Sequence, residues 1–229
     1  MLVSTAGAEQ YWIAYEGNDF PESEGWTRTY GDGTYPSSDE PDRWIEDGAL
    51  VVDTMRNPLL WEYYEIDRAI DPGPGEVFVA EWRLRFDEFI GWSFDSGLVI
   101  ARDNPPGHAV FGFDVDRFYA KEEDRWIPVS PGQYHEYRFE SRDMDSYDVF
   151  LDGTQVHTGS FDGDTFLNSF VNFGAGVQGA SSRSSWDFVR FGVIPEPRAS
   201  FLLMTGFVIQ QTLVQRLARR SNAARRAGR

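Results

Sequence analysis

Alternation of apolar and polar side chains is the feature that most constrains how this chain folds. In residues 77–86, which read VFVAEWRLRF, every second residue from Ala80 to Phe86 is apolar, and the residues between them are charged. Successive side chains of a strand point to opposite faces of its sheet, so this period predicts a strand with one buried face. Between Tyr11 and Val193 no stretch keeps a helical period over three turns.

Short extended segments separated by turn residues fill the rest of this region. Asp152-Gly153 between two such segments is typical of a β-hairpin, and Asn104-Pro105-Pro106-Gly107 interrupts another pair. Aromatic residues, 16% of the chain, suit a pleated and half-buried surface. Further strands are predicted at Leu50–Asp53, Trp61–Ile66, Leu98–Ala101, Ala109–Val115, Tyr134–Glu140, Tyr147–Leu151, Phe170–Val177 and Trp186–Val193. Many short strands with regularly spaced turns predict an all-β sandwich or barrel.

Charge is distributed unevenly along the chain. The 229 residues include 37 Asp or Glu and 21 Lys or Arg, a net charge of −16. Residues 198–229 contain seven arginines and no carboxylate, so residues 1–197 carry a net charge of −23. This acidic body argues against a nucleic-acid partner, because phosphate binding needs a face of Lys and Arg. The absence of cysteine excludes disulfides, thiolate metal sites and a cysteine nucleophile.

Three elements follow one another near the C-terminal end. Pro195-Glu196-Pro197 ends the strand pattern, Ala199–Val214 is mostly apolar, and an arginine cluster begins at Arg216 and continues with Arg219 and Arg220. This order resembles the PEP-CTERM sorting signal of bacterial surface proteins, which has a Pro-Glu-Pro tripeptide, a short membrane helix and a terminal basic cluster. Glutamines within the apolar segment and a basic tail that runs to the last residue depart from that pattern.

This resemblance implies export, anchoring in the membrane by the C-terminal helix, and recognition of the tripeptide by an exosortase. The exosortase and the export machinery are therefore expected partners. The arginine cluster then marks the cytoplasmic side, which places the acidic body outside. We expect residues 9–193 to form the body and 194–229 the sorting tail, with residues 1–8 either a signal-peptide remnant or an ordinary terminus. The alternative for the tail is an amphipathic helix that docks on the body.

A second resemblance concerns the body. It rests on Tyr15-Glu16-Gly17, Gly25-Trp26, Asp47–Asp53, Tyr134–Phe139, Tyr147–Gly153 and Ser185–Phe191. These segments resemble the LamG-like, concanavalin A-type jelly rolls that are common on bacterial surface proteins, over about residues 9–193. The implied fold is an antiparallel jelly-roll β-sandwich. Because this fold hosts lectins, glycosidases and adhesive modules alike, the resemblance does not decide the activity.

The segment Glu62–Asp67 resembles part of the catalytic strand of laminarinase-type glycosidases on this fold. Their motif, Glu-x-Asp-x-Glu or a form with one extra residue, places a nucleophile, an assisting Asp and an acid/base on one face of the strand. Glu65 and Asp67 match the first two positions, but the third is Ala69, or Ile70 with the extra residue. A retaining mechanism needs two carboxyl groups about 5 Å apart, so the missing acid/base counts against hydrolysis.

Acidic loops provide the only candidates for a metal site. Calcium takes oxygen ligands from such loops, and the candidate ligands are Asp143, Asp145, Asp162 and Asp164. None of these loops fits the twelve-residue calcium loop. The alternative is that these carboxylates are solvated and keep sheet edges from pairing with other chains.

Tryptophans provide the candidates for sugar binding, because an aromatic face packs against a pyranose ring. Trp82 and Trp186 lie in apolar registers, so we expect them in the core. Trp44 and Trp126 lie in more polar stretches and are the better candidates for exposure and ligand contact. The alternative, which we favour for each, is packing in the core or at its rim.

These features together predict an exported cell-surface or extracellular-matrix protein. Its body is expected to be a non-catalytic binding module, with polysaccharide as the favoured ligand, no catalytic residues and no enzyme activity. Two alternatives stay open: a glycoside hydrolase or lyase on the same fold, and a purely structural matrix component without a small ligand.

Overall fold

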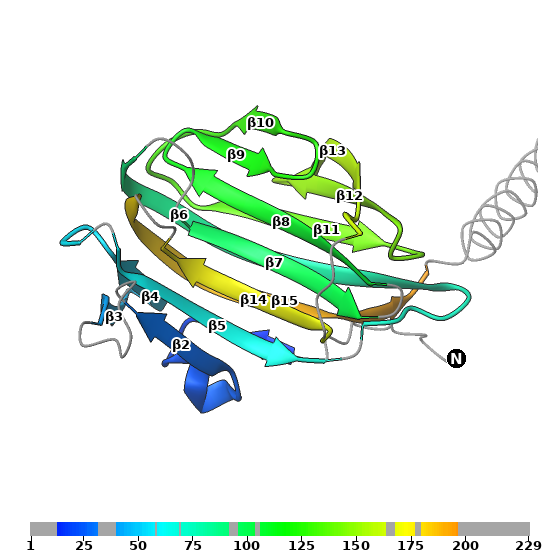
Figure 1. Ribbon diagram of the computed structural model, residues 1–229, viewed down its shortest axis with the longest axis horizontal. Coiled ribbons are helices and arrows are strands. Elements are labelled where there is room, and N and C mark those ends of the chain that lie inside the picture. Colours follow the sequence, from blue (N-terminus) through cyan, green and yellow to red (C-terminus); the bar gives the residue numbers. More distant parts are fainter. Residues whose placement is uncertain are drawn as a thin grey trace, which may run out of the picture. The chain divides into compact units, whose positions relative to one another are not determined.

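Two antiparallel β-sheets packed face to face form the folded body, as Figure 1 shows. The computed structural model describes residues 13–31, 40–57, 59–68, 70–91, 96–103, 106–163, 168–176 and 180–196. Within these ranges the only helix is the short 3₁₀ helix η1 (Pro21–Glu24). The predicted all-β jelly-roll sandwich is therefore confirmed.

The larger sheet has eight strands. They are β1 (Ile13–Tyr15), β3 (Asp42–Glu46), β4 (Ala49–Asp53), β6 (Glu76–Ile90), β11 (His135–Ser141), β12 (Ser146–Leu151), β13 (Thr154–Ser160) and β15 (Ser181–Pro195). Their order across the sheet is β13-β12-β11-β6-β15-β4-β3, and β1 pairs with β15.

The smaller sheet has seven strands. They are β2 (Thr27–Gly31), β5 (Trp61–Asp67), β7 (Ser96–Asp103), β8 (Pro106–Asp114), β9 (Arg117–Ala120), β10 (Arg125–Pro128) and β14 (Phe170–Ala175). Their order is β10-β9-β8-β7-β14-β5-β2. The strands β2 and β3, which are far from the sheet centres, form edges of the two sheets.

The strands predicted from alternation are all present, as β4, β5, β6, β7, β8, β11, β12, β14 and β15. The hairpin at Asp152-Gly153 is also present, and both residues have positive φ angles, 49° and 76°, as a tight two-residue turn requires. The strands β1, β2, β3, β9 and β10 were not predicted. Each has five residues or fewer, which is too short for alternation to stand out.

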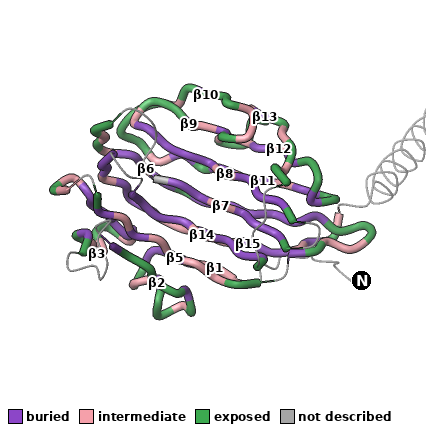
Figure 2. The backbone as a smooth tube through the Cα atoms, in the orientation of Figure 1, coloured by how far each residue is buried: buried purple, intermediate pink, exposed green. Residues whose placement is uncertain are grey.

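Aromatic rings from both sheets meet between them and form the core. Trp82 of β6 and Trp186 of β15 are fully buried, as predicted. The ring of Trp82 lies 5.4 Å from Tyr137 in its own sheet and 5.9 Å from Phe111 in the other, and Trp186 lies 5.0 Å from Phe173 of the other sheet. Figure 2 shows buried residues along the central strands and exposed residues at the edges and turns. Contacts of this kind between large rings hold the two layers together.

The body continues slightly beyond its expected end at Val193. Strand β15 runs to Pro195, and Ile194 is buried against Val77 and Val79. Backbone contacts divide the chain into Met1–Ile194 and Pro195–Arg229.

The predicted sorting tail falls almost entirely outside the described residues. Only Pro195 and Glu196 are described, whereas Pro197, the apolar segment 199–214 and the arginine cluster are not, and neither are residues 1–8. Of the helices within the described ranges, none has the length and apolar character to span a membrane.

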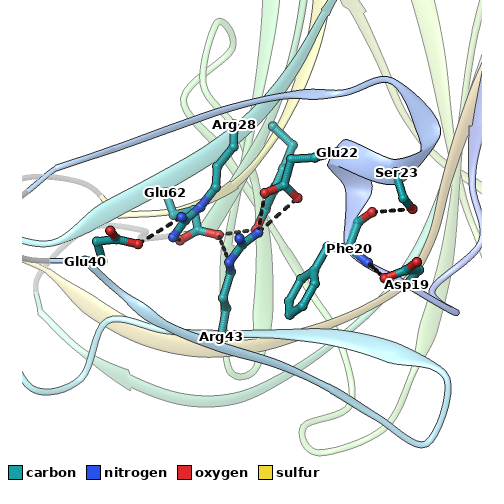
Figure 3. A network of polar contacts seen from close by, with 9 residues as sticks. Asp19, Phe20, Glu22, Ser23, Arg28, Glu40, Arg43 and Glu62 are labelled. Carbon is teal, nitrogen blue, oxygen red and sulfur yellow. Dashed lines mark hydrogen bonds and ion pairs between the residues drawn. The ribbon is translucent and has the colours of Figure 1, made fainter.

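A buried carboxylate joins the edge strands of the two sheets. The side chain of Glu62, on β5, is fully buried. Figure 3 shows the guanidinium groups of Arg28, from β2, and Arg43, from β3, converging on it. The Arg28 Nη2–Glu62 Oε2 distance is 2.7 Å, the Arg43 Nε–Glu62 Oε1 distance is 3.8 Å, and the Tyr64 hydroxyl donates a hydrogen bond to the same carboxylate.

Outer carboxylates complete the cluster. Arg28 also bonds Glu40 at 2.9 Å, and Arg43 bonds Glu22 at 2.7 Å. Each arginine is therefore shared between one buried and one more exposed carboxylate. Because β2 and β3 belong to different sheets, this cluster closes one side of the sandwich with charge rather than with apolar packing.

We expect Glu62→Gln to lower the free energy of unfolding by about 3 kcal/mol, because it leaves two largely buried guanidinium groups without their shared countercharge. Urea unfolding followed by tryptophan fluorescence measures this change. Glu136→Gln is the matched control, since Glu136 is exposed on β11, and it is expected to have almost no effect. Equal stability of the two variants would contradict the role given to the cluster.

Candidate functional site

The outer face of the seven-stranded sheet carries the two carboxylates that the sequence singled out. In β5 the side chains of Glu62 and Tyr64 are buried between the sheets. Strand alternation therefore sends Trp61, Tyr63, Glu65 and Asp67 to the opposite, outer face. Glu65 is half-buried there and Asp67 is exposed.

Glu65 is held by the neighbouring strand. Asn172 of β14 lies directly opposite Glu65 in the sheet, and their side chains are hydrogen-bonded. Burial raises the pKa of the Glu65 carboxyl, and the nearby charge of Asp67 raises it further, while the hydrogen bond from Asn172 acts in the opposite direction. The Oδ1 atom of Asn172 is buried and accepts no hydrogen bond from the described residues. The result is a carboxyl group that keeps its proton to a higher pH than an ordinary glutamate.

Asp67 lies two residues further along the same face. A strand rises about 3.2–3.4 Å per residue, so the two Cα atoms are about 6–7 Å apart. Glycosidases use carboxyl pairs about 5–5.5 Å apart when they retain configuration and about 6.5–9.5 Å apart when they invert it. The Cα spacing of Glu65 and Asp67 allows their carboxyl groups to lie at a separation of this order.

Two aromatic rings lie on the same face beside the carboxylates. The ring centroids of Trp61 and Tyr63 are 6.2 Å apart, and both side chains are half-exposed. The indole of Trp61 lies against Gly31 of β2, where a Cβ atom would be only 2.8 Å from the indole ring. The Tyr63 hydroxyl donates a 2.6 Å hydrogen bond to the carbonyl oxygen of Gly176. Neighbouring backbone thus holds both rings in place.

A row of three glycines, one each from β14, β7 and β8, runs across the outer face of the sheet from Tyr63. Tyr63 lies opposite Gly174, Gly174 opposite Gly97, Gly97 opposite Gly112, and Gly112 opposite Tyr119. With strands about 4.8 Å apart, the two tyrosines stand about 19 Å from each other across the sheet. The three strands between them contribute no side chain to this row.

The far end of the row is a second aromatic group. Trp126 of β10 stacks on Tyr119 of β9, with ring centroids 4.4 Å apart, and the guanidinium of Arg117 lies 4.4 Å from the Trp126 ring centre. Trp126 is 36% exposed, as the sequence predicted. Of the two predicted ligand-binding tryptophans, Trp126 therefore lies on the same face as Glu65.

The other predicted ligand-binding tryptophan lies elsewhere. Trp44 is half-buried on β3, in the eight-stranded sheet. Its neighbours Arg43 and Ile45 point into the sandwich, so Trp44 points to the outer face of that sheet. The structure therefore does not bring Trp44 and Trp126 together.

The described candidates for calcium binding, Asp143, Asp145 and Asp162, each bind other groups of the chain. The Asp143 carboxylate accepts hydrogen bonds from the backbone N–H groups of Asp145 and Ser146, and Asp145 pairs with Arg102 at 2.7 Å. Asp162 pairs with the backbone of β8, and Asp164 lies outside the described residues. The described part of the chain holds no group of three or more His, Cys, Asp or Glu side chains that could bind a metal ion.

Some residues of this face were not predicted as functional. Trp61 and Tyr63 share the alternation of Glu65 and Asp67, so the sequence of β5 contained the signal that could have identified them. Asn172 and the three glycines come from other strands. Their place beside β5 depends on strand order and register, and no local pattern encodes either.

The chain is similar in structure to proteins that act on carbohydrates. Residues covering 85% of this chain match the whole of an endo-1,3-β-glucanase from Streptomyces sioyaensis, with a TM-score of 0.58 and 11% identity. β-Agarase A from Zobellia galactanivorans matches with a TM-score of 0.54 and 11% identity, over 82% of this chain and 93% of its own. A carbohydrate esterase of bacteriophage phi24B matches with a TM-score of 0.58 and 9% identity, over 82% of this chain and 100% of its own. No protein-family model and no curated protein matches the chain.

These likenesses establish the jelly-roll fold and correct one expectation. The sequence predicts no enzyme activity, because the third carboxylate of the glycosidase motif is missing at Ala69, or at Ile70 with the extra residue. That expectation is wrong: the structures that share this sandwich include glycoside hydrolases and an esterase, which are enzymes. The absence of one motif residue on one strand was too narrow a ground for excluding catalysis.

The electrostatics of the carboxylate pair are testable by titration. Asp67→Asn removes a negative charge beside Glu65, so we expect this variant to lower the pKa of the Glu65 carboxyl. Asn172→Ala removes a hydrogen bond that stabilises the ionised form of Glu65, so we expect this variant to raise the same pKa. Carboxyl ¹³C NMR titration of Glu65 measures both shifts. Glu136→Gln, on the other sheet, is the control and should leave the titration unchanged. Shifts of the opposite sign would show that the two neighbours do not act on Glu65 in this way.

Proposed function

We propose that this protein is a glycoside hydrolase that acts on a polysaccharide at the outer face of its seven-stranded sheet. The observation that carries the proposal is the pairing of Glu65 with Asp67 two residues apart on that face, beside the half-exposed rings of Trp61 and Tyr63. The structural likeness to an endo-1,3-β-glucanase and a β-agarase supports it.

Glu65 suits the role of general acid. Its carboxyl pKa is raised by burial and by the charge of Asp67, so it keeps a proton to donate to the leaving glycosidic oxygen. Asp67 is exposed and suits the complementary role, as the nucleophile or as the base that activates water. Asn172 fixes the Glu65 side chain by a hydrogen bond and so positions the acid.

The aromatic groups at the two ends of the glycine row suit an extended substrate. A polysaccharide that crosses the strands would meet Trp61 and Tyr63 at one end and Tyr119 and Trp126 at the other. Between them Gly174, Gly97 and Gly112 add no side chain to the row, and all three are buried. The body is strongly acidic, so a neutral polysaccharide is a better substrate than a polyanion.

The proposal includes export and sorting. The supporting observations are the order of the Pro-Glu-Pro tripeptide, the apolar segment and the arginine cluster in the sequence. An enzyme that cleaves large polysaccharides needs access to the outside of the cell, because such substrates do not enter it intact.

The catalytic proposal predicts that the purified protein releases reducing ends from at least one of a panel of neutral polysaccharides, including β-1,3-glucan and agarose. Glu65→Gln and Asp67→Asn are each expected to reduce this rate about 100-fold or more, because each removes a group that transfers a proton or attacks the sugar. Trp61→Ala is expected to raise KM more than it lowers kcat.

One control variant and one further variant of the site complete this experiment. Glu76→Gln changes an exposed glutamate at the start of β6, outside the candidate site, and should retain full activity. Glu65→Asp tests whether the carboxyl must reach a defined position. If Glu65→Gln and Asp67→Asn retain the wild-type rate, the carboxylate pair is not catalytic; if no polysaccharide is cleaved, the hydrolase proposal fails.

The sorting proposal predicts that replacing Pro195-Glu196-Pro197 by three alanines prevents processing and surface display in a cell that contains an exosortase. Cell fractionation with an antibody to the body measures the change. Replacing Pro72-Gly73-Pro74, a second Pro-x-Pro triplet in a loop of the body, is the matched control. Normal display of the tail variant would contradict sorting by this tripeptide.

A further inference from the structure

An open pocket of about 180 Å³ lies on the outer face of the eight-stranded sheet, the layer opposite the candidate catalytic face. Its lining residues are all polar and come from β6, β15, the β3–β4 turn and the segment before β11. They are Glu46, Asp47, Arg83, Arg85, Tyr134, Ser185 and Asp187.

The two arginines of the pocket are held by ion pairs and by a tyrosine ring. Arg83 pairs with Asp187, and Arg85 forms a two-point pair with Asp87 at 2.6 and 3.2 Å. The guanidinium carbons of Arg83 and Arg85 lie 4.9 and 5.1 Å from the centre of the Tyr134 ring. These contacts fix the arginines while their remaining N–H groups stay available to a ligand.

Two further carboxylates belong to the β3–β4 hairpin turn. Asp47 and Gly48 have positive φ angles of 52° and 77°, as a tight hairpin turn requires, and this turn places Glu46 and Asp47 at the pocket. Both residues are exposed, and the charge of Glu46 acts on Arg85 of the same pocket. The pocket therefore contains exposed hydrogen-bond acceptors beside two arginines that ion pairs hold in place.

The charges of the lining disfavour an anionic ligand. An anion would meet three carboxylates, and the two arginines are already paired with Asp187 and Asp87. A neutral molecule with several hydroxyl groups avoids this repulsion, because each hydroxyl can donate to a carboxylate and accept from a guanidinium.

The volume of the pocket limits the size of the ligand. Small-molecule sites usually measure about 300–1,000 Å³, so a pocket of about 180 Å³ suits a single ring rather than a longer ligand. We infer that this pocket is a second carbohydrate site, which binds one neutral sugar residue on the face opposite the candidate catalytic site. Such a site would hold the protein on a glycan while the other face acts on its substrate.

The inference is tested by titrating the ¹⁵N-labelled full chain with D-glucose and D-galactose in ¹H–¹⁵N NMR. We expect shifts of the amides of Glu46, Gly48 and Ser185 with at least one neutral sugar. Arg83→Ala should raise the dissociation constant about tenfold, the loss expected when one hydrogen bond to a charged group is removed. Arg56→Ala is the matched control, because the side chains of Arg83 and Arg56 are both 44% exposed and Arg56 lies outside the pocket.

A charged analogue of the same ring tests the ligand class. D-Glucuronate carries a negative charge and is expected to bind more weakly than the neutral sugar, because Glu46 and Asp47 repel it. Tighter binding of D-glucuronate, or no shift at the pocket with either neutral sugar, would overturn the inference. Glu46→Gln provides a second variant if Arg83→Ala does not fold.

Different results would contradict the catalytic site on the seven-stranded sheet and the second carbohydrate site on the eight-stranded sheet. Loss of sugar binding in Arg83→Ala with an unchanged rate of polysaccharide cleavage supports the second site alone. Loss of cleavage in Glu65→Gln with unchanged shifts at Gly48 supports the catalytic site alone. Shifts confined to the seven-stranded sheet would remove the second site and leave the catalytic proposal standing.

Discussion

The two-residue period of β5 is the constraint on which both the fold and the candidate site depend. Glu62 and Tyr64 point inward, where the carboxylate of Glu62 binds the arginines of the two edge strands. Glu65 and Asp67 point outward on the same strand. A shift of one residue in this strand would place Glu62 in solvent and bury Asp67 without a partner. The buried ion cluster therefore stabilises the register that also exposes the candidate catalytic pair.

The two outer faces of the sandwich are both polar but differ chemically. On the eight-stranded sheet the charges are mostly paired: the buried carboxylate of Glu81 binds Arg138 and Arg190, and Arg183 binds Asp53. On the seven-stranded sheet, Asn172 and the rings of Trp61 and Tyr63 lie near the pair Glu65 and Asp67. Paired charges make a stable surface, whereas like charges side by side raise the pKa of one of them and leave it reactive. This difference is why we place catalysis on the smaller sheet and binding alone in the pocket of the larger one.

The motif at Glu65 and Asp67 illustrates how a one-strand pattern can mislead about catalysis. The motif has three carboxylates on one strand, and Ala69 in the third position predicts that hydrolysis is absent. In the sheet, however, Glu65 is hydrogen-bonded to Asn172, which is more than one hundred residues away in sequence. Groups that tune a catalytic carboxyl come from whichever strand lies beside it, so the residues of one strand do not suffice to decide the chemistry.

The sequence by itself determined the fold class, the longer strands, the hairpin at Asp152-Gly153 and the burial of Trp82 and Trp186, because alternation and turn chemistry act within a few residues. It also singled out Glu65 and Asp67 as an incomplete motif without expecting catalysis there, and Trp126 as a candidate for ligand contact. Only the tertiary structure decided that Glu62 is buried between two arginines and that Asn172 is hydrogen-bonded to Glu65. It also decided that three glycines align between two aromatic groups, and that Trp44 lies on the outer face of the eight-stranded sheet. Each of these depends on strand order and register, which arise from contacts between segments far apart in the chain.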